Sequence, residues 1–173
     1  MSFPFTIAID GPVASGKTTI GRELARRLGY RFVDTGIMYR AVTQWALEEG
    51  MDLGDAPRLS ALAKMRAAEA GKLALADEPA GLWTQAVGRG VSLVARVSGV
   101  RRALVAQQQL MAEESATVMV GRDIGTVVLP KAAKVYLDAP VRVRIGRRRA
   151  QIEAQGNAVD EEDVRAELEL RDR

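Results

Sequence analysis

Cysteine and histidine are both absent from the sequence. Without cysteine, the chain forms no disulfide and offers no thiolate to a metal. Without histidine, it lacks the residue that most often serves as a general base or a metal ligand. A reaction that needs no imidazole is therefore favoured, such as attack by a phosphate oxygen that is already anionic at neutral pH.

Aromatic residues make up only 5% of the chain, and the formal net charge is only +3. A nucleic-acid-binding protein usually has a larger basic excess and an aromatic stacking surface, so we expect no nucleic-acid partner. No apolar run approaches the roughly 20 residues that span a bilayer, and the first ten residues lack the charged segment of a signal peptide. We expect a monomeric, cytoplasmic protein with no membrane partner.

Short apolar segments alternate with amphipathic ones along the chain. Strands are predicted at residues 5–10, 30–34, 116–120 and 133–139. Helices are predicted at residues 17–29, 35–50, 56–71, 91–114 (two helices, broken near Ser98), 141–156 and 160–173. Because the strands are apolar on both faces and alternate with helices, they predict an α/β fold: a parallel sheet with helices on both faces. We expect residues 1–173 to form one domain.

Helical periodicity predicts which side chains of these helices face the core. In the helix at 17–29 they are Ile20, Leu24 and Leu28. In the helix at 35–50 they are Met38, Val42, Trp45 and Ala46. Asp160 is the expected N-cap of the last helix.

The segment GPVASGKT, at residues 11–18, matches the P-loop pattern G-x-x-x-x-G-K-[ST] and lies between a predicted strand and a predicted helix. Such a loop curls its backbone N–H groups around phosphate oxygens at the positive end of a helix. The residues expected to bind the ATP phosphates are Gly11, Pro12, Val13, Ala14, Ser15, Gly16, Lys17, Thr18 and Thr19. Lys17 would reach the β- and γ-phosphates, and the Thr18 hydroxyl would bind Mg²⁺. The alternative, a glycine-rich turn with a chance Lys-Thr pair, is disfavoured by the strand–loop–helix context.

A P-loop does not by itself identify the phosphate acceptor. A GTPase needs an Asn-Lys-x-Asp motif, whereas the one asparagine, Asn157, precedes an alanine. A motor-type ATPase usually carries an apolar strand that ends in Asp-Glu, whereas the strand at 116–120 leads into Gly-Arg-Asp. The remaining class is a small phosphotransferase that acts on a small molecule.

The segment DTGIMYRA, at residues 34–41, follows the second predicted strand. Ligands of doubly wound sheets bind at the carboxyl ends of the strands. The residues therefore placed to bind an acceptor beside the P-loop are Asp34, Thr35, Gly36, Tyr39 and Arg40. For Arg40 alone, a solvated position on the helix is the alternative.

Five segments resemble the bacterial cytidylate kinase family, in the same order: IAIDGPVASGKTT, LGYRFVDTGIMYRAV, VSLVARVSGVRRALVAQQQ, MVGRDIGTVVLP and KVYLDAPVRVRIGRRR. The resemblance implies a nucleoside monophosphate kinase fold of the P-loop class and transfer of a phosphoryl group from ATP to CMP or dCMP with Mg²⁺. It also implies an acceptor-side insert around 50–98, shorter here than in the family, and a lid around 141–160. The family pattern continues past residue 173 with a further strand and helix, so we expect the given residues to belong to a longer protein.

The resemblance also assigns roles to residues of this chain. Those that would hold the acceptor phosphate are Arg40, Arg101 and Arg122, with Thr35 near the ribose and phosphate. Those that would contact the nucleoside are Ser92, Asp123 and Arg171. The lid arginine would be Arg147, Arg148 or Arg149, with Arg148 as the candidate. The expected catalytic residues are thus Lys17, Arg40, Arg122 and Arg148.

Arg122 and Asp123 are adjacent in the sequence. One interpretation assigns Arg122 to the acceptor phosphate and Asp123 to the cytosine base. A carboxylate accepts a hydrogen bond from the N4 amine of cytosine, whereas uracil places a carbonyl there. A site built for one such group can reject the wrong analogue by orders of magnitude. The alternatives left open are an ion pair that only stabilises the loop, a P-loop kinase with another acceptor (UMP, AMP or a non-nucleotide), and a non-catalytic nucleotide-binding module.

Overall fold

The computed structural model describes residues 5–77, 79–154 and 159–172, with the side chains of residues 167 and 170–172 left aside. The elements follow the order β1 (Thr6–Asp10), α1 (Lys17–Leu28), β2 (Arg31–Asp34), α2 (Thr35–Glu48), α3 (Ala56–Leu73), α4 (Gln85–Arg96), α5 (Ser98–Glu114), β3 (Thr117–Val120), the π-helical turn η1 (Ile124–Val128), β4 (Ala133–Tyr136), α6 (Val141–Ala154) and α7 (Glu161–Asp172).

The four strands form one parallel sheet in the order β2-β3-β1-β4. The register places Thr6 opposite Thr117, and Thr117 opposite Arg31. All four strands therefore end at the same edge, and the loops that follow β1, β2 and β3 lie close together there. The parallel α/β fold predicted from the sequence is confirmed.

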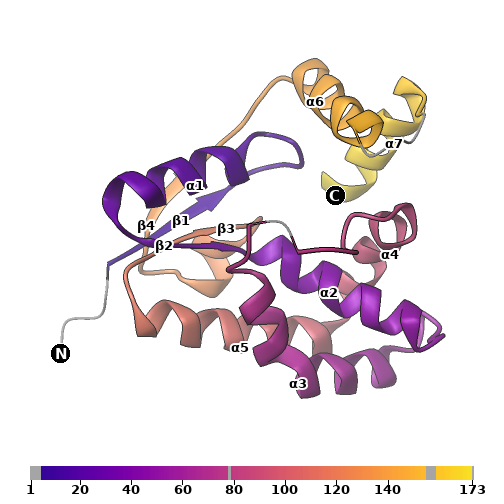
Figure 1. Ribbon diagram of the computed structural model, residues 1–173, viewed down its shortest axis with the longest axis horizontal. Coiled ribbons are helices and arrows are strands. Elements are labelled where there is room, and N and C mark those ends of the chain that lie inside the picture. Colours follow the sequence, from indigo (N-terminus) through magenta and orange to yellow (C-terminus); the bar gives the residue numbers. More distant parts are fainter. Residues whose placement is uncertain (1–4, 78, 155–158, 173) are drawn as a thin grey trace.

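Helices cover both faces of the sheet (Figure 1). Helix α1 packs on one face, against β2 and β3. Helices α2, α3 and α5 form a layer on the other side, and this layer contains the larger core cluster. The predicted inner face of α2 is confirmed, because its members are all at most 7% exposed: Met38, Val42, Trp45 and Ala46.

Periodicity predicts the inner face of helix α1 only in part: Leu24 packs against the core cluster of Ile9, Ala25, Val118 and Val120, as expected. Ile20 and Leu28 are 49% and 45% exposed, so the prediction that they face the core is wrong. The buried residues are Gly21 and Ala25. A Cβ atom on Gly21 would lie only 2.6 Å from Cγ1 of Val120, which shows that the helix approaches the sheet too closely for large side chains.

Several boundaries also differ from those expected. Helix α4 begins at Gln85, six residues earlier than predicted, because the side chain of Thr84 accepts a hydrogen bond from the amide of Val87 and caps the helix. Strand β4 ends at Tyr136 rather than at residue 139. The predicted cap of α7 is confirmed: the amide of Glu162 donates to Oδ1 of Asp160 over 3.1 Å.

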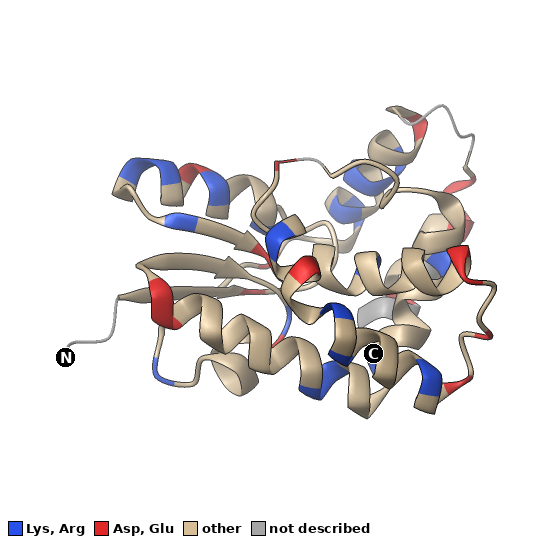
Figure 2. Ribbon diagram, turned by 60° about the horizontal axis from the view of Figure 1, so that its bottom comes forward, with Lys and Arg blue, Asp and Glu red and all other residues tan. Residues whose placement is uncertain are grey.

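Helices α6 and α7 pack against each other beside the P-loop rather than on the sheet (Figure 1). Their own small apolar cluster consists of Ile145, Val164 and Leu168, and Val13 of the P-loop packs against it. Charged residues lie mainly on the helices and at strand ends (Figure 2). Within the described residues, no helix has the length and apolar character needed to cross a membrane.

Candidate functional site

The P-loop connects the end of β1 to the start of α1 through a backbone that glycine makes possible. Gly11 and Gly16 have φ angles of +153° and +103°. A Cβ atom on Gly11 would lie 2.0 Å from the carbonyl oxygen of Leu137, so no side chain fits there. Ala14 has a φ angle of +59°, which is strained for a residue with a Cβ atom. The resulting concave loop lies at the N-terminus of α1, the geometry that suits an anionic phosphate.

Two side chains of α1 lie at the mouth of this loop. Nζ of Lys17 donates to the carbonyl oxygen of Pro12 over 2.6 Å and lies across the loop. The Thr18 hydroxyl donates to Oδ2 of Asp34 over 2.8 Å, and Oδ1 of Asp34 accepts from the amide of Gly36 over 3.0 Å. Asp34 thus caps α2 with one oxygen and faces α1 with the other.

Thr18 and Asp34 together offer hard oxygen donors. Mg²⁺ is usually bound by one or two carboxylates together with substrate phosphates, and this pair fits that pattern. Among the described residues, no group of three or more acidic, cysteine or histidine side chains forms a metal site.

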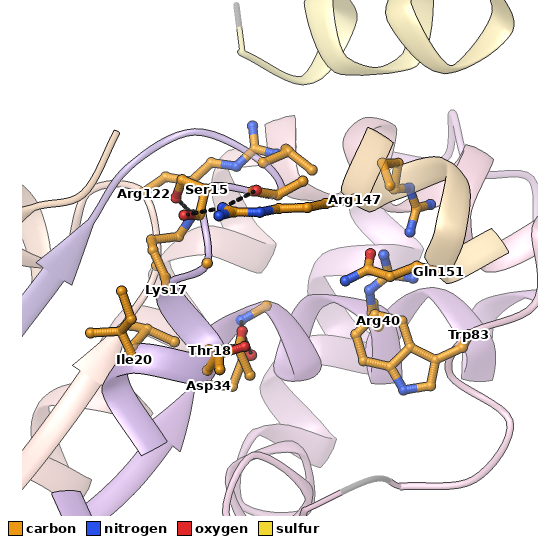
Figure 3. A pocket seen from close by; sticks show the side chains of 18 of the residues that line it. Ser15, Lys17, Thr18, Ile20, Asp34, Arg40, Trp83, Arg122, Arg147 and Gln151 are labelled. Atoms are coloured by element: carbon orange, nitrogen blue, oxygen red, sulfur yellow. Dashed lines mark hydrogen bonds between the residues drawn. The ribbon is translucent and has the colours of Figure 1, made fainter. Parts of the chain in front are cut away.

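A cavity of about 730 Å³ opens between the P-loop, α2 and α6. Figure 3 shows Lys17 and Ser15 on one side of it and Arg40 and Trp83 on the other. Its lining includes most of the predicted phosphate and acceptor residues: Val13, Ala14, Ser15, Gly16, Lys17, Thr18, Thr19, Gly36, Arg40, Arg122 and Arg148. Gly11 and Pro12 belong to the loop but do not line the cavity.

Two of the three consecutive arginines of α6 face the cavity, and the third does not. Nη1 of Arg147 donates to the carbonyl oxygen of Ser15 over 2.9 Å, and the residue lines the cavity (Figure 3). Arg148 also lines the cavity and is only 8% exposed. Arg149 forms an exposed ion pair with Glu153, with Nε 2.7 Å from Oε1. The cavity therefore contains Arg147 and Arg148.

A second group of predicted residues lies outside the lining of this cavity. The guanidinium of Arg101 donates to the carboxylate of Asp123, and both interact electrostatically with Tyr39. Burial raises the pKa of the Tyr39 phenol above its ordinary value. Asp123 thus has an arginine partner, but that partner is Arg101 of α5 and not the adjacent Arg122, which lines the cavity.

The remaining predicted residues lie elsewhere. Thr35 is buried, and its hydroxyl donates to the carbonyl oxygen of Val120 over 2.9 Å. Ser92 is half-buried on α4, outside the cavity lining. Arg171 is part of α7, but its side chain is outside the described residues.

Asp10 has a role in the site that the sequence analysis missed. Its carboxylate, only 8% exposed, accepts hydrogen bonds from the amides of Ile124 and Gly125, each over 2.8 Å. These bonds join the start of the P-loop to the turn η1, which follows directly after Arg122 and Asp123. A carboxylate at the end of a buried strand was the available signal, because such a charge needs hydrogen-bond donors.

Trp83 is a second residue that the sequence analysis missed. It lines the cavity and lies against Arg40, whose guanidinium carbon is 4.3 Å from the indole centroid. It falls between the predicted helices at 56–71 and 91–114, where the periodicity predicted no element.

Comparison with known proteins points to one family. A family model described as cytidylate kinase matches residues 7–173. A cytidylate kinase from Pelotomaculum thermopropionicum is 44% identical over 182 residues, covering 99% of this chain and 80% of that protein. A cytidylate kinase from Solibacter usitatus is 42% identical over 173 residues, covering 96% of this chain and 75% of that protein. A bifunctional pantoate ligase/cytidylate kinase from a Synechococcus species is 44% identical over 179 residues, covering 96% of this chain and 33% of that protein.

Proposed function

Because the chain belongs to the cytidylate kinase family, we propose that it transfers the γ-phosphoryl group of ATP to CMP or dCMP, giving ADP and CDP or dCDP. One observation carries this proposal: a single cavity brings the P-loop together with arginines from three separate segments. These are Arg40 of α2, Arg122 after β3 and Arg148 of α6. Such a cavity suits two phosphorylated substrates whose phosphates must meet.

The proposed reaction uses positioning and charge stabilisation rather than a general base. An oxygen of the CMP phosphate attacks the γ-phosphorus, and the bond to the β–γ bridging oxygen breaks. The attacking oxygen is already anionic, which agrees with a chain that contains no histidine. Lys17 and the cavity arginines of α6 would neutralise the charge that spreads over the transferred group.

Thr18 and Asp34 are the residues proposed to hold Mg²⁺. Held by these two residues, Mg²⁺ would supply positive charge that offsets part of the negative charge of the phosphates. The P-loop backbone would hold the ATP phosphates, because its glycines let the amides converge on one point. Arg147 and Arg148 would close over the phosphates from α6, which we propose as part of a lid at 141–160 that excludes water.

We propose that base recognition belongs to the group formed by Arg101, Asp123 and Tyr39. Asp123 would accept a hydrogen bond from the N4 amine of cytosine. Because Arg101 pairs with Asp123, we assign Arg101 to the base as well, rather than to the acceptor phosphate. Arg40 and Arg122, which line the cavity, would bind that phosphate. The monomeric state, the cytoplasmic location and the acceptor-side role of residues 50–98 stay predictions.

A coupled assay of ADP release tests the proposal with ATP, Mg²⁺ and, separately, CMP, dCMP, UMP and AMP. We expect turnover with CMP and dCMP far above that with UMP and AMP. In Asp123→Ala this preference should be lost or relaxed. The matched control is Asp77→Ala, because the Asp77 side chain is 87% exposed and pairs with Arg22, away from the cavity.

Two outcomes would contradict the proposal. Turnover that favours UMP, AMP or a non-nucleotide acceptor would indicate another P-loop kinase. Measurable ATP binding without transfer to any monophosphate would indicate a nucleotide-binding module.

A further inference from the structure

The segment at residues 82–84 is anchored at both ends. The side chain of Leu82 is 3% exposed and belongs to the main core cluster. Thr84 caps α4 by accepting a hydrogen bond from the amide of Val87. Trp83 lies between these two anchors, so its backbone is held in place although its side chain is 40% exposed.

Leu82 and Trp83 contact Arg40 in two complementary ways. Nη1 of Arg40 donates to the carbonyl oxygen of Leu82 over 3.1 Å. The guanidinium carbon lies 4.3 Å from the centroid of the Trp83 indole. The hydrogen bond orients the edge of the guanidinium, and the indole covers its face. Arg40 is only 5% exposed, so both contacts act where water screens them little.

A cation–π contact suits an arginine that must bind an anion. The indole attracts the guanidinium through its face, whereas the N–H donors of a guanidinium lie in its plane. Fixing a long side chain before the ligand arrives lowers the entropy lost on binding.

We propose that Trp83 is a positioning residue: it holds the Arg40 guanidinium in the orientation that binds the phosphate of the acceptor nucleotide. This inference rests on the proposed function, because it takes CMP as the ligand. Trp83 acts through Arg40 and strengthens acceptor binding, while ATP binding depends on the P-loop on the opposite side of the cavity (Figure 3).

Trp83→Leu and Trp83→Phe test the proposal in the full chain. The measurements are the KM for CMP, the KM for ATP, kcat, and the Kd for CMP by calorimetry. In Trp83→Leu we expect the KM and the Kd for CMP to rise about 5- to 30-fold, the range of a partly to fully desolvated cation–π contact. Trp83→Phe keeps an aromatic face and should raise them only about 2- to 5-fold. The KM for ATP and kcat should change less than about 3-fold. The substitution weakens acceptor binding equally in the ground state and in the transition state, so it changes the KM for CMP and not kcat.

The chain contains a matched control in a second tryptophan–arginine contact. The guanidinium carbon of Arg66 lies 3.6 Å from the centroid of the Trp45 ring, and neither residue lines the cavity. Arg66→Leu should therefore leave the KM for CMP unchanged. If Trp83→Leu unfolds at a lower temperature, Trp83→Met provides a second replacement without a ring, whose flexible side chain adapts to irregular gaps, and the same rise in KM is expected of it.

The proposal is overturned if Trp83→Leu binds CMP within 2-fold of the wild type, or if the phenylalanine variant is as impaired as the leucine variant. In both cases a wild-type enzyme that phosphorylates CMP leaves the proposed function intact. A wild-type protein that binds CMP without turnover, and more weakly after Trp83→Leu than after Trp83→Phe, would refute the kinase activity and support the positioning role. Absence of CMP binding would refute both.

Discussion

The carboxylate of Asp10 connects the P-loop to the turn that carries Arg122 and Asp123, and Asp10→Asn tests that connection. In the wild-type protein both carboxylate oxygens accept backbone hydrogen bonds, from Ile124 and Gly125, each over 2.8 Å. An asparagine has one acceptor oxygen, and its amide nitrogen would face an N–H group. One of the two hydrogen bonds is therefore lost, and the remaining one is made to a neutral oxygen instead of a charged carboxylate.

The expected cost follows from the burial of these groups. A hydrogen bond to a charged group contributes about 1.5–3 kcal/mol, and a buried donor left unsatisfied costs about 1–3 kcal/mol. Asp10 and Ile124 are 8% and 1% exposed, so water cannot easily replace the missing acceptor. We expect Asp10→Asn to lower the free energy of unfolding by about 2–4 kcal/mol. At about 2–4 °C per kcal/mol for a chain of this size, the Tm should fall by roughly 4–16 °C.

Urea unfolding followed by circular dichroism measures this change, with a thermal melt as the second measurement. Asp138→Asn is the control, because the Asp138 carboxylate also accepts a backbone hydrogen bond, from Ala139 over 2.7 Å, but is exposed. We expect this control to change stability by less than about 0.5 kcal/mol. A decrease below about 1 kcal/mol in Asp10→Asn would refute the reasoning, because it would mean that other contacts hold the turn.

Three other changes follow from the backbone and the packing. Ala14→Gly should raise stability by about 0.5–1 kcal/mol in urea unfolding, because relief of the strain at φ +59° exceeds the extra entropy of the unfolded chain; a lower urea midpoint would contradict this. Gly21→Val should lower stability by about 2–3 kcal/mol by the same measurement, since even a Cβ atom would lie 2.6 Å from Cγ1 of Val120; an unchanged midpoint would show that α1 can shift. Burial raises the pKa of Tyr39 above 10.0, so the stability it contributes is present below about pH 10 and is lost as the pH rises through the folded-state pKa. Tyr39→Phe should therefore lose less stability above pH 10 than the wild type, and equal losses would oppose this account.

The strand, loop and helix that form the P-loop could be predicted from the sequence because their geometry is local. Gly11, Gly16, Lys17 and Thr18 are close neighbours in the chain, and the strand and helix around them are visible in the apolar pattern. Parallel strands end at one edge of the sheet, so the sequence also predicted that Arg40 would lie near the P-loop. The structure places both in the lining of one cavity.

The partners of individual side chains could not be predicted in the same way. Asp10 bonds to amides more than 110 residues away, and Asp123 pairs with Arg101 rather than with its neighbour. Both depend on how η1 and α5 pack, which no local pattern encodes.

The sequence by itself determined the P-loop, the alternation of strands and helices, and the residue types available to bind phosphate. Only the tertiary structure decided the strand order β2-β3-β1-β4 and the face that α1 turns to the sheet. It also decided that Arg147 and Arg148 face the cavity while Arg149 pairs with Glu153. The physical reason is that neighbouring residues fix the local backbone, whereas the rotation and docking of a helix are set by the surfaces it meets.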